Sequence, residues 1–170
     1  MKMKLNLKRP EGMKADIHLE TFTDASFAPG GAKSRSGVVI MMNGHVVHWT
    51  SKKQSIVTLS TCESEMLAQV TGMKLGLSIR QLMVELLGNE RKVWMSLKGD
   101  NMAAMYSLQT EVSSWRTRHY STFAAWIREK IEEYKVKLVH VPGKELVADG
   151  LTKLLGRILL EEFRRRIALQ

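Results

Sequence analysis

The chain has 170 residues, of which 44% are hydrophobic and 25% charged, and its formal net charge is +9 at pH 7. This length supports one buried core and is too short for two large domains. No apolar run approaches the roughly 20 residues of a membrane span, and the N-terminus lacks the apolar centre of a signal peptide, which predicts an intracellular protein. Cys62 is the only cysteine, which excludes an internal disulfide and a cysteine-based zinc cluster. The positive charge favours a polyanion such as nucleic acid, although a solvated basic face explains it equally well.

The first third of the chain predicts a tether followed by three strands. Residues 1–16 are rich in lysine and methionine without a regular period, and we interpret them as a tether to a longer polyprotein. Residues 17–27 suit a strand, which Pro29 and two glycines end. Two β-rich runs then flank Asn43-Gly44, a dipeptide that favours the positive φ angles of a type I′ turn. We therefore expect an antiparallel hairpin with strands at 37–42 and 45–51.

The rest of the chain predicts helices alternating with strands. Met66, Val70 and Met73 fall on one face of a helical pattern that runs from about 60 to 87. The later elements are expected as a strand at 92–98, helices at about 101–108 and 114–134, a strand at 136–141, a helix at about 145–155 and a basic helix from about 157. This order predicts an α/β fold with a mixed sheet covered by helices. The domain then spans 17–155, and residues 156–170 form a basic C-terminal helical extension.

Three aspartates stand where strands end or helices begin, and each has an ordinary structural explanation. Asp24 in TFTDASF ends a strand that should be central, where a turn can use its carboxylate. Asp100 in VWMSLKGDN stands between a strand and a helix, which is the position of a helix N-cap. Asp149 in VPGKELVADGLTK is expected in the first turns of a helix, four residues before Lys153, a spacing that favours a salt bridge.

The segment STCESEM offers two glutamates that cannot share one face of a helix. Ser60 and Glu63 have the spacing of a capping box, which gives Glu63 a structural role. Glu65 falls on an approximate stripe with Gly72 and Gly76, and glycines at these positions let a helix backbone approach a sheet closely. We therefore expect Glu65 to point toward the strand ends.

Asp24, Glu65, Asp100 and Asp149 are expected to converge on one edge of the sheet. Four carboxylates at one place repel one another unless cations neutralise them. Oxygen-only ligands suit Mg²⁺ or Mn²⁺ rather than zinc. Two such ions can hold both the attacking and the leaving oxygen of a phosphodiester. The cluster therefore predicts a metal site for phosphodiester chemistry.

Six segments of the chain resemble the ribonuclease H domain of retrotransposon reverse transcriptases, most closely the Ty1/copia type. They are TFTDASF, SGVVIMMNGHVVHWTSKKQ, TLSTCESEMLAQ, KGDNMAAM, RTRHY and VHVPGKELVADGLTK, in that order. The resemblance implies a ribonuclease H-like fold, with a five-stranded mixed sheet of three antiparallel strands and then two parallel ones. It places the family's four metal-binding, catalytic acids on Asp24, Glu65, Asp100 and Asp149, with two Mg²⁺ ions for which Mn²⁺ can substitute.

The resemblance also implies the reaction, in which the RNA strand of an RNA·DNA hybrid is hydrolysed to leave a 3′-hydroxyl and a 5′-phosphate. The partners are then the hybrid, read through its 2′-hydroxyls, and a reverse transcriptase polymerase domain in the parent polyprotein. The isolated domain is expected to be a monomer, located in the cytoplasm or in a retrotransposon particle. The candidate substrate contacts are Ser26, Ser60, Thr61, Cys62, Asn101, Arg116, Arg118 and His119.

The sequence leaves open the roles of two histidines and two alternative functions. Cellular ribonucleases H carry a mobile histidine in a loop before the last acid, whereas His140 lies in strand-like sequence and is expected to be a packed or edge-strand residue. His119 can contact phosphates or belong to a solvated helix end. A catalytically inactive hybrid-binding or structural module of a reverse transcriptase would keep the fold and lose an acid. An integrase or transposase would use fewer acids.

Overall fold

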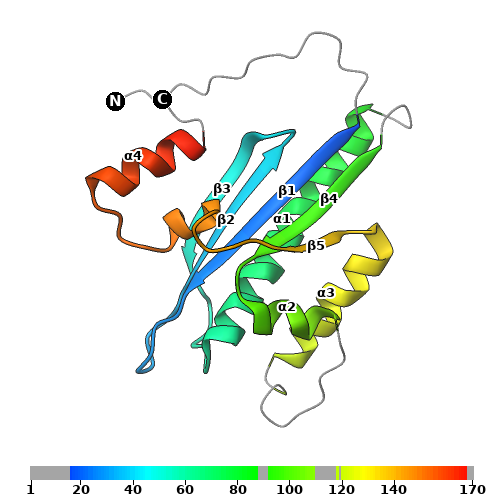
Figure 1. The fold of residues 1–170 in the computed structure, drawn as a ribbon. Helices are drawn as coiled ribbons and strands as arrows, with labels where there is room; N and C mark the ends of the chain where they lie inside the picture. Colours follow the sequence, from blue (N-terminus) through cyan, green and yellow to red (C-terminus); the bar gives the residue numbers. More distant parts are fainter. Residues whose placement is uncertain (1–15, 88–91, 110–117, 119, 168–170) are drawn as a thin grey trace.

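The computed structural model describes residues 16–87, 92–109, 118 and 120–167, and it contains a five-stranded sheet with helices on both faces (Figure 1). The strands are β1 (Ile17–Ser26), β2 (Arg35–Met42), β3 (His45–Lys53), β4 (Val93–Gly99) and β5 (Lys137–His140). Their order across the sheet is β3-β2-β1-β4-β5. β1 and β2 pair antiparallel, as do β2 and β3, whereas β4 is parallel to both β1 and β5. The predicted arrangement of the sheet is confirmed.

The β2–β3 hairpin turns at the predicted dipeptide. Asn43 has a φ of 50° and Gly44 a φ of 81°, and two successive positive values define the type I′ turn that the sequence predicts. The side chain of Asn43 also accepts a hydrogen bond from the His18 N–H on β1, at 2.8 Å. The turn therefore fixes the register of three strands at the end of the sheet that lies away from Asp24.

The helices are α1 (Thr61–Leu87), α2 (Met102–Gln109), α3 (Ser121–Tyr134) and α4 (Arg157–Arg166), and η2 (Val147–Leu151) is a single 3-10 turn. Side chains of β1 alternate between two cores. Leu19 packs with Met66 of α1 and Ile127 of α3 on one face, and Phe22 packs with Val147 of η2 on the other. None of the described helices is long and apolar enough to cross a membrane.

Glycines bring α1 unusually close to the sheet. A Cβ on Gly72 would lie 2.3 Å from Cγ2 of Thr23, and one on Gly76 would lie 2.3 Å from Cε of Met95. No side chain fits in such a space, so the backbone itself packs on β1 and β4. The predicted close approach is confirmed, and it brings the first turns of α1, which carry Glu65, to the edge where β1 ends.

Two predicted helices are wrong in extent. Residues 145–155 form only η2, because this segment is pressed against its neighbours: a Cβ on Gly150 would lie 2.3 Å from the ring of Phe163, and one on Gly37 of β2 would lie 2.9 Å from the Ala148 oxygen. The helix predicted at 114–134 begins at Ser121, and Arg118 lies in a turn. Residues 114–117 and 119 lie outside the described part of the chain.

Candidate metal centre

The parallel pairing of β1 and β4 sets Asp24 beside Asp100. Phe22 of β1 is the register partner of Lys98 of β4, and each aspartate stands two residues further along its own strand direction. The carboxyl ends of parallel strands meet at one edge of a sheet, so both carboxylates come to this edge. Asp24 is buried, with 4% of its surface exposed, and Asp100 is half-buried.

The start of α1 separates the two glutamates as predicted. The Oγ of Ser60 accepts a hydrogen bond from the Glu63 N–H at 3.1 Å, and Oε2 of Glu63 accepts one from the Leu59 N–H at 2.6 Å. Glu63 therefore takes part in capping the N-terminus of α1. Glu65 instead joins the two aspartates: one oxygen from each of Asp24, Glu65 and Asp100 lies within 4.8 Å of the other two.

Asn101, and not Asp100, caps helix α2. Its Oδ1 accepts a hydrogen bond from the Ala104 N–H at 3.0 Å, the contact that an N-cap side chain makes with the third helical residue. The N-cap interpretation of Asp100 is therefore wrong, and its carboxylate is left to face the other acids. The backbone oxygen of Asp100 accepts a hydrogen bond from Nε2 of His140, at 3.0 Å.

His140 ends the edge strand β5, as predicted. Because a carbonyl oxygen only accepts, the bond to Asp100 requires the proton of this imidazole to be on Nε2. His140 thus contacts the β4–α2 junction from the edge of the sheet.

Asp149 lies at the same edge but outside the group of three. Its carboxylate forms a salt bridge with Lys153, so the structural interpretation offered for Asp149 is confirmed. Its charge nevertheless raises the pKa of both Asp24 and Glu65. The hydroxyl of Thr152 donates a hydrogen bond to Oδ2 of Asp24. Asp149 is therefore close enough to Asp24 and Glu65 to influence both, and the ammonium group of Lys153 balances its own charge.

Burial and the repulsion of neighbouring carboxylates disfavour the charged forms of Asp24 and Glu65. Burial, together with the charges of Asp24 and Asp100, raises the pKa of Glu65 to about 9, even though a hydrogen bond from the Ala25 backbone lowers it. Burial likewise raises the pKa of Asp24, which the Thr152 hydrogen bond opposes. A divalent cation removes this penalty, and a set of carboxylate oxygens is the donor set that Mg²⁺ and Mn²⁺ prefer. The residues present therefore fit such an ion.

Two of the candidate substrate contacts already have a structural role. Ser60 and Asn101 each use a side-chain oxygen to cap a helix, α1 and α2 respectively, so any contact with a substrate would come in addition to that role. Ser26 ends β1 two residues after Asp24, Thr61 is exposed at the start of α1, and burial raises the pKa of the half-buried Cys62. Arg118 is exposed, whereas Arg116 and His119 lie outside the described residues.

A group of cations that the sequence did not single out lies beyond the end of β1. Arg35 is the register partner of both Ser26 and Lys53, and Lys52 precedes Lys53; we call these three cations the basic edge. Like charges directly opposite each other on neighbouring strands are destabilising. No carboxylate of the described residues forms a salt bridge with any of the three.

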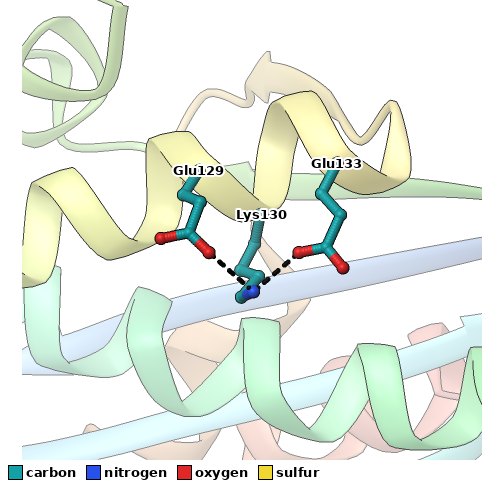
Figure 2. A network of polar contacts seen from close by, with 3 residues as sticks. All are labelled: Glu129, Lys130 and Glu133. Atoms are coloured by element: carbon teal, nitrogen blue, oxygen red, sulfur yellow. Dashed lines mark hydrogen bonds and ion pairs between the residues drawn. The ribbon is translucent and has the colours of Figure 1, made fainter.

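Lys130 on α3 shows the contrasting arrangement (Figure 2). Its Nζ lies 2.9 Å from Oε1 of Glu129 and 2.6 Å from Oε2 of Glu133, and these bonds raise the pKa of Lys130. Both carboxylates come from the same helix, so the charge of Lys130 is already balanced within α3. The three cations of the basic edge, in contrast, have no carboxylate partner among the described residues.

Solved structures of ribonucleases H share this fold. LC11-RNase H1, isolated from compost, matches with a TM-score of 0.59 and 20% sequence identity over 80% of this chain and 91% of that chain. RNase H1 of the halophilic archaeon Halobacterium salinarum NRC-1 matches with a TM-score of 0.58 and 16% identity over 79% and 93%. A structure of LC11-RNase H1 in complex with an RNA/DNA hybrid has a TM-score of 0.57, 18% identity and coverages of 80% and 93%. The protein has a ribonuclease H-like fold.

The sequence is related to retrotransposon polyproteins. It is 30% identical over 145 residues to the retrovirus-related Pol polyprotein from transposon TNT 1-94 of Nicotiana tabacum, covering 84% of this chain and 11% of the polyprotein. Identity is 28% over 153 residues with that of transposon RE2 of Arabidopsis thaliana, covering 89% and 10%. It is 27% over 142 residues with the Ty1-NL2 Gag-Pol polyprotein of Saccharomyces cerevisiae, covering 82% and 8%.

The chain thus spans about a tenth of the length of these relatives. No protein-family model matches it. Over most of its length it is a distant homologue of Ty1/copia-type retrotransposon Pol polyproteins, and its fold matches that of RNase H1.

Proposed function

We propose that this chain hydrolyses the RNA strand of RNA·DNA hybrids, using two Mg²⁺ or Mn²⁺ ions, as the ribonuclease H of a retrotransposon reverse transcriptase. The observation that carries the proposal is the convergence of Asp24, Glu65 and Asp100, with oxygens within 4.8 Å of one another, at the strand ends of a ribonuclease H-like sheet. An integrase-type reading has less support, because a fourth acid, Asp149, stands at the same edge.

In this proposal all four acids bind the ions. Asp24, Glu65 and Asp100 form the close group, and Asp149 completes the set when it parts from Lys153. Bound ions would activate a water for attack on the phosphate and neutralise the leaving oxygen. The burial of Asp24 and Glu65 keeps bulk water away from their carboxylates, which strengthens every charge interaction at this edge.

The surroundings of the acids suit a nucleic-acid duplex. The basic edge begins at Arg35, two register positions beyond Asp24, which is about 7 Å along the strands at 3.3–3.4 Å per residue. That reach is suited to a backbone phosphate near the scissile one. Ser26, Thr61, Cys62 and Arg118 would add contacts on the side of α1 and α3. A polymerase domain in the parent polyprotein and a location in a retrotransposon particle complete the proposal.

Cleavage of an end-labelled RNA·DNA hybrid in Mg²⁺ and in Mn²⁺ tests this function. The parent chain is expected to shorten only the RNA strand, and Asp100→Asn to leave it intact while still binding the hybrid. Glu145→Gln, which changes an exposed carboxylate outside the cluster, serves as the matched control and should cleave normally. If the parent binds the hybrid but cleaves it in neither metal, the nuclease is wrong and an inactive hybrid-binding module is the better description.

A further inference from the structure

Thr152 connects the segment that carries Asp149 to the acid on β1. Its hydroxyl donates a hydrogen bond to Oδ2 of Asp24 and lies 3.1 Å from the backbone oxygen of Asp149. Because the acceptor on Asp24 is a buried carboxylate oxygen, losing this donor would leave it poorly solvated. The two carboxylate oxygens offer about four lone-pair sites. Asp24 can therefore accept this bond and bind a cation at the same time.

Packing against β2 and β3 determines where Thr152 lies. Gly37 is the register partner of Asp24, and a Cβ on Gly37 would lie 2.8 Å from Cγ2 of Thr152 and 3.1 Å from Cβ of Leu151. The missing side chain thus provides the space that Thr152 occupies. Ser51 of β3 adds an anchor, since its Oγ donates a hydrogen bond to the Leu151 backbone oxygen at 2.6 Å. The hydroxyl reaches Asp24 from a segment that two strands hold in place.

Building on the proposed function, we propose that Thr152 is a positioning residue that orients the Asp24 carboxylate for metal binding. The bond restricts rotation of the carboxylate before an ion arrives. Partners that hold a metal ligand in this way typically contribute about 10- to 100-fold in metal affinity or activity.

Isothermal titration calorimetry with Mn²⁺, on the full chain without hybrid, tests this role. Thr152→Val keeps the shape of the side chain and removes the donor, so we expect its Mn²⁺ affinity to fall by about 10-fold or more. Thr152→Ser keeps the hydroxyl and should bind Mn²⁺ like the parent. Ser51→Ala loosens the segment that carries Thr152 but keeps the hydroxyl, so its affinity should fall less than that of Thr152→Val.

Several results would overturn the role. They are an unchanged affinity in Thr152→Val, an equal loss in Thr152→Ser and Thr152→Val, or a parent chain that binds no Mn²⁺. If Thr152→Val does not fold, as judged by circular dichroism, Thr152→Ala replaces it, and the serine variant remains decisive. The hybrid assay distinguishes this inference from the proposed nuclease activity. If the parent binds Mn²⁺ more tightly than Thr152→Val but does not cleave the hybrid, the proposed function is wrong and the positioning role of Thr152 stands.

Discussion

Replacement of Glu65 by glutamine should stabilise the metal-free protein while it removes a proposed metal ligand. The raised pKa of Glu65 means that the folded chain, without an ion, retains a proton that the unfolded chain gives up. Holding the carboxylate charged beside Asp24 and Asp100 opposes folding. Glutamine has nearly the same shape and no charge, so it avoids this cost.

The size and sign of the effect follow from the pKa of Glu65, which is about 9 in the folded chain against an ordinary value of 4.5. Between these values the folded state binds more protons than the unfolded state, so the free energy of unfolding decreases as the pH rises. The decrease is about 1.4 kcal/mol per pH unit, which amounts to about 3 kcal/mol at pH 7. Below pH 4.5 the cost disappears. Burial raises the pKa of Asp24 as well, so that residue adds to the decrease.

Urea unfolding in EDTA at pH 4, 6 and 8 measures this difference. Glu65→Gln is expected to match the parent at pH 4 and to exceed it in stability by an increasing amount at pH 6 and 8. Addition of Mg²⁺ should then stabilise the parent and not the variant, because binding to the folded state alone raises stability. Glu145→Gln, at an exposed position, is the control and should follow the parent throughout. A variant that is less stable than the parent at pH 8 in EDTA would refute the reasoning.

Two further predictions concern the helix start and the basic edge. Glu63→Ala should lower the free energy of unfolding by about 0.5 to 2 kcal/mol through loss of the cap, and leave cleavage intact in the folded protein; loss of cleavage without loss of stability would mean that Glu63 belongs to the site. Lys53→Gln should reduce the slope of log K against log salt for hybrid binding by about 1, whereas Lys130→Gln, whose ammonium lies between two glutamates, should leave it unchanged. Equal slopes for both variants would show that the basic edge does not contact phosphates.

Local signals in the sequence were sufficient to separate Glu63 from Glu65. The capping box depends on residues three positions apart, and the glycine stripe depends on the period of one helix, so both can be read along the chain. The Asn43-Gly44 turn and the strand ends at Asp24 and Asp100 were predictable for the same reason. If β1 and β4 are assumed to pair in parallel, Asp24 and Asp100 are expected to lie at the same edge of the sheet.

Features that depend on contacts between distant segments were not predictable. The cap of α2 is an exception, because this choice is local: Asp100 and Asn101 are adjacent and both suit an N-cap, and the hydrogen bond from the Ala104 N–H shows that Asn101 caps the helix. The short η2 turn replaces the predicted helix because Gly37 and Gly150 allow close packing against β2 and α4. The opposition of Arg35 and Lys53 depends on the register of the hairpin, which shifts by one residue between Ile40 and Met41, so the turn alone does not set it.

Among the described residues, the positive groups at this edge balance only part of its negative charge. Lys153 balances Asp149, and Thr152 supports Asp24, yet nothing in the described residues offers Glu65 a positive partner at salt-bridge distance. A purely structural cluster would have no reason to bury this glutamate where its pKa rises to about 9. The instability is confined to the acids, while the capping box, the glycine stripe and the anchors on η2 hold their backbone in place. Residues that lower the free energy of unfolding locally, on a backbone that is held rigidly, are the pattern expected at a binding site.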